Sequence, residues 1–152
     1  MIAYLSGPLF SIAEREFNKS FAQLLQAQVP GLQIILPQVD AEPEPDCENF
    51  EAQAHQNCLN LLTKSDLVIA ILEGSDADSG TCIEIGYAAA KGIPIIGVRT
   101  DFRASQDRGV NLMVSQSCTE LLSIATESIA DLAETVGATV LQVTQKDSQS
   151  NY

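Results

Sequence analysis

The segment from Asp66 to Leu72 constrains the fold of this chain more than any other part of the sequence. After Asp66 it reads Leu-Val-Ile-Ala-Ile-Leu, an unbroken apolar run. A strand with one face in water alternates apolar and polar residues, whereas a parallel strand covered on both faces does not. The run therefore predicts a buried parallel strand with helices on both sides of its sheet.

The rest of the chain alternates between strand-like and helix-like segments. Further strands are predicted at 2–6, 32–36, 94–98 and 119–125. Helices are predicted at 11–28, 49–64, 80–91 and 126–136, and polar loops at 38–48, 73–79 and 100–109. This alternation predicts an α/β protein with a doubly wound, parallel five-stranded sheet and helices on both faces. The length of 152 residues suits one domain, expected at 1–144, with a polar tail at 145–152.

The fold class also predicts where a ligand would bind. In an open parallel sheet, ligands bind beyond the carboxyl ends of the strands, at the point where the strand order reverses. If the order is 2-1-3-4-5, that point lies between the first and third strands. The flanking loops are then Ser6 to Phe10 and Glu73 to Gly80.

The charge and the cysteines narrow the function further. The chain has 20 acidic and 8 basic residues, a formal net charge of −12, which would repel a nucleic-acid polymer. Its four cysteines show no CxxC spacing and it has one histidine, His55, so a zinc site is not expected. No apolar run approaches the ~18 residues of a membrane span, and no basic segment follows Met1. We expect a cytoplasmic protein with reduced thiols and no membrane partner.

The two loops carry no familiar cofactor motif. The turn at Ser6, Gly7 and Pro8 lacks the glycine patterns of dinucleotide and triphosphate sites. The segment from Asp76 to Gly80 resembles a calcium loop, but Tyr87 stands where the bidentate glutamate should be. The sequence therefore predicts neither a cofactor nor a metal.

Glu84 is the most informative residue of the second loop and its helix. It lies among apolar neighbours, and an unpaired buried carboxylate is costly, so it is either paired or functional. Asp78 lies six residues earlier, near the helix N-terminus. Structural alternatives exist for both: Thr81 and Glu84 fit the S/T-x-x-E capping box, and Asp78 fits a plain N-cap. Spacing alone leaves both alternatives open.

Three segments follow one another along the chain: Tyr4 to Phe10, then Asp66 to Ala70 followed by Asp78 to Ala88, and then Asn111 to Met113. Together, in this order and spacing, they resemble the nucleoside 2-deoxyribosyltransferases. The resemblance covers roughly residues 2–125. It implies a flavodoxin-like fold and a ping-pong exchange of 2-deoxyribose between purine or pyrimidine bases, with deoxyribonucleosides and free nucleobases as partners.

The resemblance also implies roles for individual residues. Glu84 would attack the anomeric carbon and form a covalent glycosyl intermediate, as in retaining glycosidases. Tyr4 would hold Glu84 by a hydrogen bond, and Asp78 would bind the sugar hydroxyls or handle the proton of the leaving base. Asn111 would reach the sugar 5′-hydroxyl in a neighbouring subunit's site, with Met113 closing the same pocket. A homo-oligomer, dimer or hexamer, is therefore expected.

The remaining substrate-binding residues are expected around the base and the sugar. The base would lie against Phe10 and the segment of Gln38 and Asp40, and the other contacts are expected from Gly7, Ser79 and Gly80. Cys58 stands where the family often carries an aspartate that protonates the base. A thiol, with an ordinary pKa of about 8.5, is a poorer acid, so Asp78 or water would supply the proton.

Two other functions stay open at this point. A hydrolase of deoxynucleoside 5′-monophosphates would need phosphate donors near the first loop, where the nearest cation is Arg15. A non-catalytic nucleotide-binding domain could use the same fold. Some relatives place their terminal carboxylate in the site, and the sequence does not decide whether Tyr152 does so.

Overall fold

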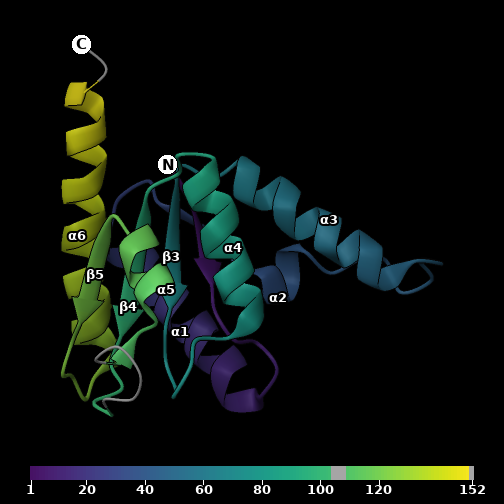
Figure 1. The fold of residues 1–152 in the computed structure, drawn as a ribbon, viewed down its shortest axis with the longest axis horizontal. Helices are drawn as coiled ribbons and strands as arrows, with labels where there is room; N and C mark the ends of the chain where they lie inside the picture. The colour runs from purple at the N-terminus through teal and green to yellow at the C-terminus, as the bar shows by residue number, and fades with distance from the viewer. Residues whose placement is uncertain (104–108, 151–152) are drawn as a thin grey trace.

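A computed structural model describes residues 1–103 and 109–150 of the chain. Within these ranges, a parallel sheet lies between two layers of helices (Figure 1). The strands are β1 (Ile2–Ser6), β2 (Gln33–Ile35), β3 (Leu67–Ile71), β4 (Ile95–Arg99) and β5 (Glu120–Ser123). The helices are α1 (Ile12–Gln28), α2 (Pro37–Asp40), α3 (Phe50–Thr63), α4 (Ser79–Ala90), α5 (Leu112–Ser117) and α6 (Ile129–Ser150).

The strand order of the sheet is β2-β1-β3-β4-β5, and all neighbouring strands are parallel. The predicted doubly wound topology is confirmed, and the order reverses beside β1. There β1 pairs with β3 in a register that sets Tyr4 against Val68 and Ser6 against Ala70. The carboxyl ends of these two strands therefore meet at one edge, and the loops after them flank the switch point.

β3 is covered on both faces, as its apolar run predicted. Because successive side chains of a strand point to opposite faces, its residues divide between two cores. Leu67, Ile69 and Ile71 pack in the core formed with α1 and α6, whereas Val68 and Ala70 pack in the core under α3, α4 and α5. In Figure 1, α4 and α5 lie in front of the sheet and α1 and α6 lie behind it.

The structure differs from the sequence prediction in three helical segments. α2 is a single turn that begins at Pro37 and overlaps the start of the predicted loop at 38–48, with the Asp40 carboxylate accepting from the Leu36 N–H at 2.7 Å. α5 occupies a segment for which no element was predicted. α6 begins at Ile129 rather than 126 and ends at Ser150 rather than 136.

The length of α6 has a clear packing reason. Val136, Val140 and Val143 are buried, and their spacing of four and three residues continues one helical stripe against α1. The helix thus continues into the segment expected as a polar tail at 145–152. Tyr152, whose carboxylate was considered for the site, lies outside the described residues.

Candidate active site

Glu84 lies on the face of α4 that packs against the sheet. Asp78 is the N-cap of this helix, and its Oδ2 accepts from the Thr81 N–H at 2.9 Å and from the Thr81 hydroxyl at 3.3 Å. Thr81 is therefore already inside the helix, so it cannot act as the N-cap of a box with Glu84. The capping-box alternative is wrong for Glu84, whereas the N-cap alternative describes what Asp78 does in this structure.

β1 supplies two hydroxyl groups to the Glu84 carboxylate. Tyr4 and Ser6 are two residues apart on the strand, so both side chains point to the face covered by α4. The Tyr4 hydroxyl donates to Glu84 Oε1 at 2.6 Å, and the Ser6 hydroxyl donates to Glu84 Oε2. Both donors are 0% exposed. Each oxygen of the carboxylate therefore has a buried hydrogen-bond donor.

The surroundings shift the acid–base behaviour of the pair. Burial raises the pKa of Glu84, and the Asp78 charge adds to this, while the bonds from Ser6 and Tyr4 lower it; the pKa stays above its ordinary value. Burial and the Glu84 charge raise the pKa of Tyr4 far above its ordinary range. Tyr4 is therefore a protonated donor at every physiological pH, and Glu84 is its acceptor.

Small residues stand at three of the predicted substrate-binding positions, Gly7, Ser79 and Gly80. A Cβ on Gly7 would lie 3.0 Å from the Ile71 Cβ, so β1 leaves the sheet in close contact with β3. A Cβ on Gly80 would lie 3.0 Å from the Asp78 Oδ2, so glycine lets the aspartate fold over the start of α4. Ser79, the first residue of α4, is exposed.

Two ionic groups anchor the loop that carries Asp78. The Arg99 guanidinium is 4% exposed and donates to the carbonyls of Leu72 at 2.6 Å and Gly74 at 2.9 Å. The half-buried Glu73 carboxylate accepts from the Thr100 N–H and hydroxyl, each at 2.7 Å. These bonds join the loops after β3 and β4, which fixes the start of α4 relative to the sheet.

A small cavity of about 240 Å³ opens beside Cys58. It is mainly apolar, with Gln38, Arg15 and Glu42 as polar members; its other walls are Leu9, Pro37, Ala41, Pro43, Phe50, Ala54 and Cys58. Burial raises the pKa of the Cys58 thiol, the Tyr4 hydroxyl lowers it and the Glu84 charge raises it, so the Cys58 wall of the cavity is within electrostatic reach of the carboxylate. Cavities for drug-sized ligands measure about 300–1,000 Å³, so this one suits a smaller ring system.

The Gln38 amide in that cavity is held in one orientation. Its Nε2 donates to the Arg15 carbonyl at 3.0 Å, and its Oε1 accepts from the Asn18 amide at 3.1 Å. Asn18 is 6% exposed and also donates to the Pro8 carbonyl at 3.0 Å. The same buried amide thus connects the loop after β1 with Gln38.

Other predicted residues lie apart from Glu84. Asn111 caps α5 by accepting from the Met113 N–H at 2.9 Å, and both line a cavity of about 380 Å³ with Cys82 and Gly86. Those two α4 residues lie two positions before and after Glu84, about 200° around the helix from it. Within one chain, Asn111 therefore faces the far side of α4.

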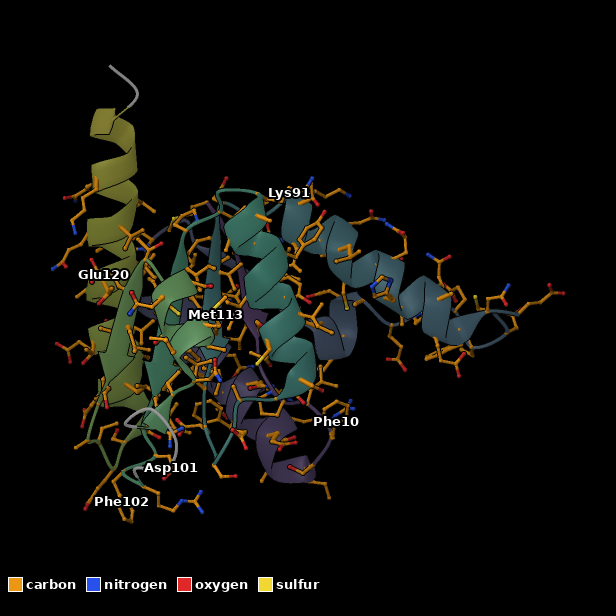
Figure 2. The ribbon with its side chains drawn as sticks, viewed as in Figure 1. Phe10, Lys91, Asp101, Phe102, Met113 and Glu120 are labelled. Atoms are coloured by element: carbon orange, nitrogen blue, oxygen red, sulfur yellow. The ribbon has the colours of Figure 1, made fainter. Side chains whose placement is uncertain are left out.

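Three predicted contacts with the base or sugar lie at the surface. Met113 on α5 is 75% exposed, and Phe10 is 77% exposed beside the start of α1 (Figure 2). The Asp40 carboxylate is engaged in its bond to the Leu36 N–H.

Ser6 is the site residue that the sequence interpretation missed. A signal was available, because Ser6 lies two residues after Tyr4 and so shares its face of the strand. Among the residues that the structure describes, no group of three or more His, Cys, Asp or Glu side chains is placed to hold a metal ion. No helix among residues 1–103 and 109–150 has the length and apolarity needed to cross a bilayer.

Fold and site define an α/β protein with a hydrogen-bonded carboxylate at the switch point of its sheet and a small, mainly apolar cavity beside Cys58. The sequence model for nucleoside 2-deoxyribosyltransferases matches residues 3–113, and the chain belongs to this family. Its members act on nucleosides and nucleobases, so the protein is an enzyme of the deoxyribosyltransferase or N-glycosidase type. No curated protein matches the chain.

Solved structures agree with the fold. A conserved protein from Enterococcus faecalis V583 is 26% identical, with 88% of this chain and 95% of that one covered and a TM-score of 0.70. A 2-deoxyribosyltransferase from Bacillus psychrosaccharolyticus is 19% identical, with 88% of this chain and 90% of that one covered and a TM-score of 0.66. A CMP N-glycosidase from Clostridium botulinum is 18% identical, with 90% of this chain and 98% of that one covered and a TM-score of 0.57. The predicted flavodoxin-like architecture is confirmed.

Proposed function

We propose that this protein transfers 2-deoxyribose between nucleobases by a ping-pong mechanism, through a covalent ester between the sugar and Glu84. The observation that carries the proposal is the Glu84 carboxylate held by Tyr4 and Ser6 at the switch point. Burial also raises the pKa of Glu84, and a carboxylate with a perturbed pKa at the ligand-binding edge of a sheet is a candidate functional group. Family membership supplies the substrate class.

In the first half-reaction, a Glu84 oxygen forms a bond to the anomeric carbon as the bond to the base nitrogen breaks. The electron pair leaves with the base, which takes up a proton. The transition state resembles an oxocarbenium ion, and an adjacent anion stabilises it. A second base then attacks the same carbon, and the ester bond breaks with its pair returning to Glu84. Two inversions give overall retention.

Proton transfer to the leaving base falls to Asp78 or to water. The bonds that Asp78 makes to Thr81 use its Oδ2, and its Oδ1 is directed to the sugar hydroxyls or the base in this proposal. Cys58 occupies the position of the family's proton-donating aspartate. Because burial raises its pKa, the thiol is a weak acid for this task.

The base occupies the cavity beside Cys58. The amide of Gln38 is fixed by Asn18 and the Arg15 carbonyl, and in this proposal it reads a base edge. Phe10 and Asp40 stay predictions for this region, with the Phe10 ring closing over the base once substrate is bound.

Asn111 and Met113 serve a neighbouring subunit in this proposal. In their own chain they line a cavity on the side of α4 away from Glu84. The same two helices carry exposed apolar side chains, Ile83 on α4 and Leu112 on α5, at 64% and 59% exposure. A second copy that covered this surface would bury apolar area and bring Asn111 toward its partner's site.

Hydrolysis of deoxynucleoside 5′-monophosphates is the second candidate. It is favoured by one observation, which is that Arg15 lines the same cavity as Cys58 and could pair with a phosphate. In that reaction water replaces the second base.

Incubation with deoxyadenosine and cytosine separates the two candidates. A transferase forms deoxycytidine, and free deoxyribose without a new nucleoside would contradict the transfer proposal. A parallel incubation with deoxynucleoside 5′-monophosphates, using wild type and Arg15→Gln, tests the hydrolase. Glu84→Gln should release no base, with Glu134→Gln, an exposed position on α6, as the matched control. Wild-type rates in Glu84→Gln would refute the assignment of the nucleophile.

A further inference from the structure

Ser6 is a buried serine whose hydroxyl contacts the Glu84 carboxylate. It is the last residue of β1, it is 0% exposed, and it donates to Glu84 Oε2 while Tyr4 donates to Oε1. The hydroxyl is thus committed to the carboxylate and is shielded from solvent.

A donor in this position acts differently on the two states of Glu84. A hydrogen bond to an ionised acceptor is about twice as strong as one between neutral groups. In the free enzyme Glu84 is a carboxylate, and in the glycosyl intermediate it is a neutral ester. The Ser6 bond therefore stabilises the free carboxylate more than the ester.

We propose that Ser6 is a positioning residue that promotes the second half-reaction, in which Glu84 leaves the sugar. The proposal rests on the proposed function, with Glu84 as nucleophile. In this step the bond between the anomeric carbon and the Glu84 oxygen breaks, and its electron pair returns to the carboxylate. The incoming base forms the new bond to carbon and loses its proton to solvent. The role is the same if water is the acceptor.

The other groups facing Glu84 do not replace Ser6. Tyr4 holds the opposite oxygen, and the negative charge of Asp78 opposes ionisation of Glu84. The Cys58 thiol from α3 has a raised pKa and stays neutral. Among the described residues, Ser6 is the donor to Oε2, so its removal leaves that oxygen without a buried partner as charge returns to it.

The test measures the two half-reactions separately in wild type, Ser6→Ala and Ser6→Cys. Excess enzyme is mixed with each of the four natural deoxyribonucleosides, and base release and the intact mass of the protein are followed. A second base is then added to the glycosyl-enzyme, and new nucleoside is measured. Ser65→Ala is the control, because Ser65 is also buried, at 7% exposure, but donates to the Leu61 carbonyl.

In Ser6→Ala we expect base release within about threefold of wild type, and return of the sugar slowed about tenfold, the effect of losing one charge-assisted bond. The glycosyl-enzyme should accumulate, and the acid limb of base release should move to higher pH. Ser6→Cys, which keeps a weak donor, should lie between Ser6→Ala and wild type.

Two results would overturn the proposal. One is that Ser6→Ala slows both half-reactions equally with an unchanged pH profile. The other is that Ser6→Ala carries out both half-reactions at wild-type rates. If Ser6→Ala unfolds at a lower temperature than Ser65→Ala, Ser6→Cys is the deciding variant. The proposal then requires that Ser6→Cys slows return of the sugar more than it slows base release. Failure of the proposed function looks different, because wild type then releases no base from any donor, or Glu84→Gln still does.

Discussion

Replacing Tyr4 by phenylalanine removes one hydroxyl from the site and keeps the ring that packs between β1 and α4. The ring is 0% exposed and belongs to the core with Ile85 and Ala88, so Tyr4→Phe should fold normally. The lost bond is the 2.6 Å contact with Glu84 Oε1. A hydrogen bond to a charged partner contributes about 1.5–3 kcal/mol. At about 1.4 kcal/mol per tenfold, return of the sugar to a second base, the step in which Glu84 regains its charge, should slow by roughly 10- to 100-fold when that base is added to the glycosyl-enzyme.

The pH dependence gives Tyr4→Phe a second readout. The Tyr4 bond lowers the pKa of Glu84 against the effect of burial, so its removal raises that pKa further. Base release needs ionised Glu84, and its acid limb should therefore move to higher pH. The assay is single-turnover base release between about pH 4 and 9, a range that spans carboxyl and imidazole titration.

Tyr87→Phe is the matched control for Tyr4→Phe. It also loses one hydroxyl, which contacts the Thr63 hydroxyl at 2.9 Å between α3 and α4, away from the carboxylate. The control should keep the wild-type rate and pH profile. A change of less than about twofold in Tyr4→Phe, or an equal loss in both variants, would refute the reasoning that Tyr4 acts through Glu84.

Three further changes test other features of the structure. Glu84→Gln should raise the melting temperature at neutral pH, because the pKa of Glu84 is higher in the folded than in the unfolded chain and its charge therefore destabilises the fold at neutral pH. This gain should vanish below the unfolded pKa of Glu84, and melting temperatures measured across pH check both expectations. Asn111→Ser keeps a capping side chain for α5 but loses the amide. If Asn111→Ser and Glu84→Gln are each inactive, a one-to-one mixture of the two variants whose subunits have exchanged should regain about a quarter of wild-type activity. No recovery would contradict a site shared between subunits. Arg99→Met leaves the carbonyls of Leu72 and Gly74 without their donor and should lower the free energy of unfolding, measured in urea, by about 3 kcal/mol. A loss below about 1 kcal/mol would show that these bonds are dispensable.

The elements that locate the site could be predicted from local pattern. The apolar run of β3 indicated a strand covered on both faces, and the alternation of elements indicated the parallel sheet and its switch point. The segments that were missed have weaker local signals. α5 spans Leu112–Ser117, too short for a helical period to emerge. The end of α6 was missed because Gly137, a residue typical of helix ends, follows directly after residue 136, although Val140 and Val143 continue the buried stripe.

The candidate site was only partly predictable, because its members come from distant segments. The sequence left Glu84 open between a capping box and a functional carboxylate. Pairing of β1 with β3 and the packing of α4 on that face resolved the choice by bringing Tyr4 and Ser6 to the two oxygens of Glu84. Ser6 was not a candidate until that contact was known.

The sequence by itself determined the fold class, the family resemblance and the loops that flank the crevice, because these depend on periodicity and on motifs within short segments. The tertiary structure decided which groups meet. Tyr4 and Ser6 are separated from Glu84 by 80 and 78 positions in the sequence. Their hydrogen bonds arise from strand pairing and helix packing, and no local pattern encodes them. The same packing buries Glu84 and raises its pKa, so the carboxylate's chemistry is a property of the folded chain.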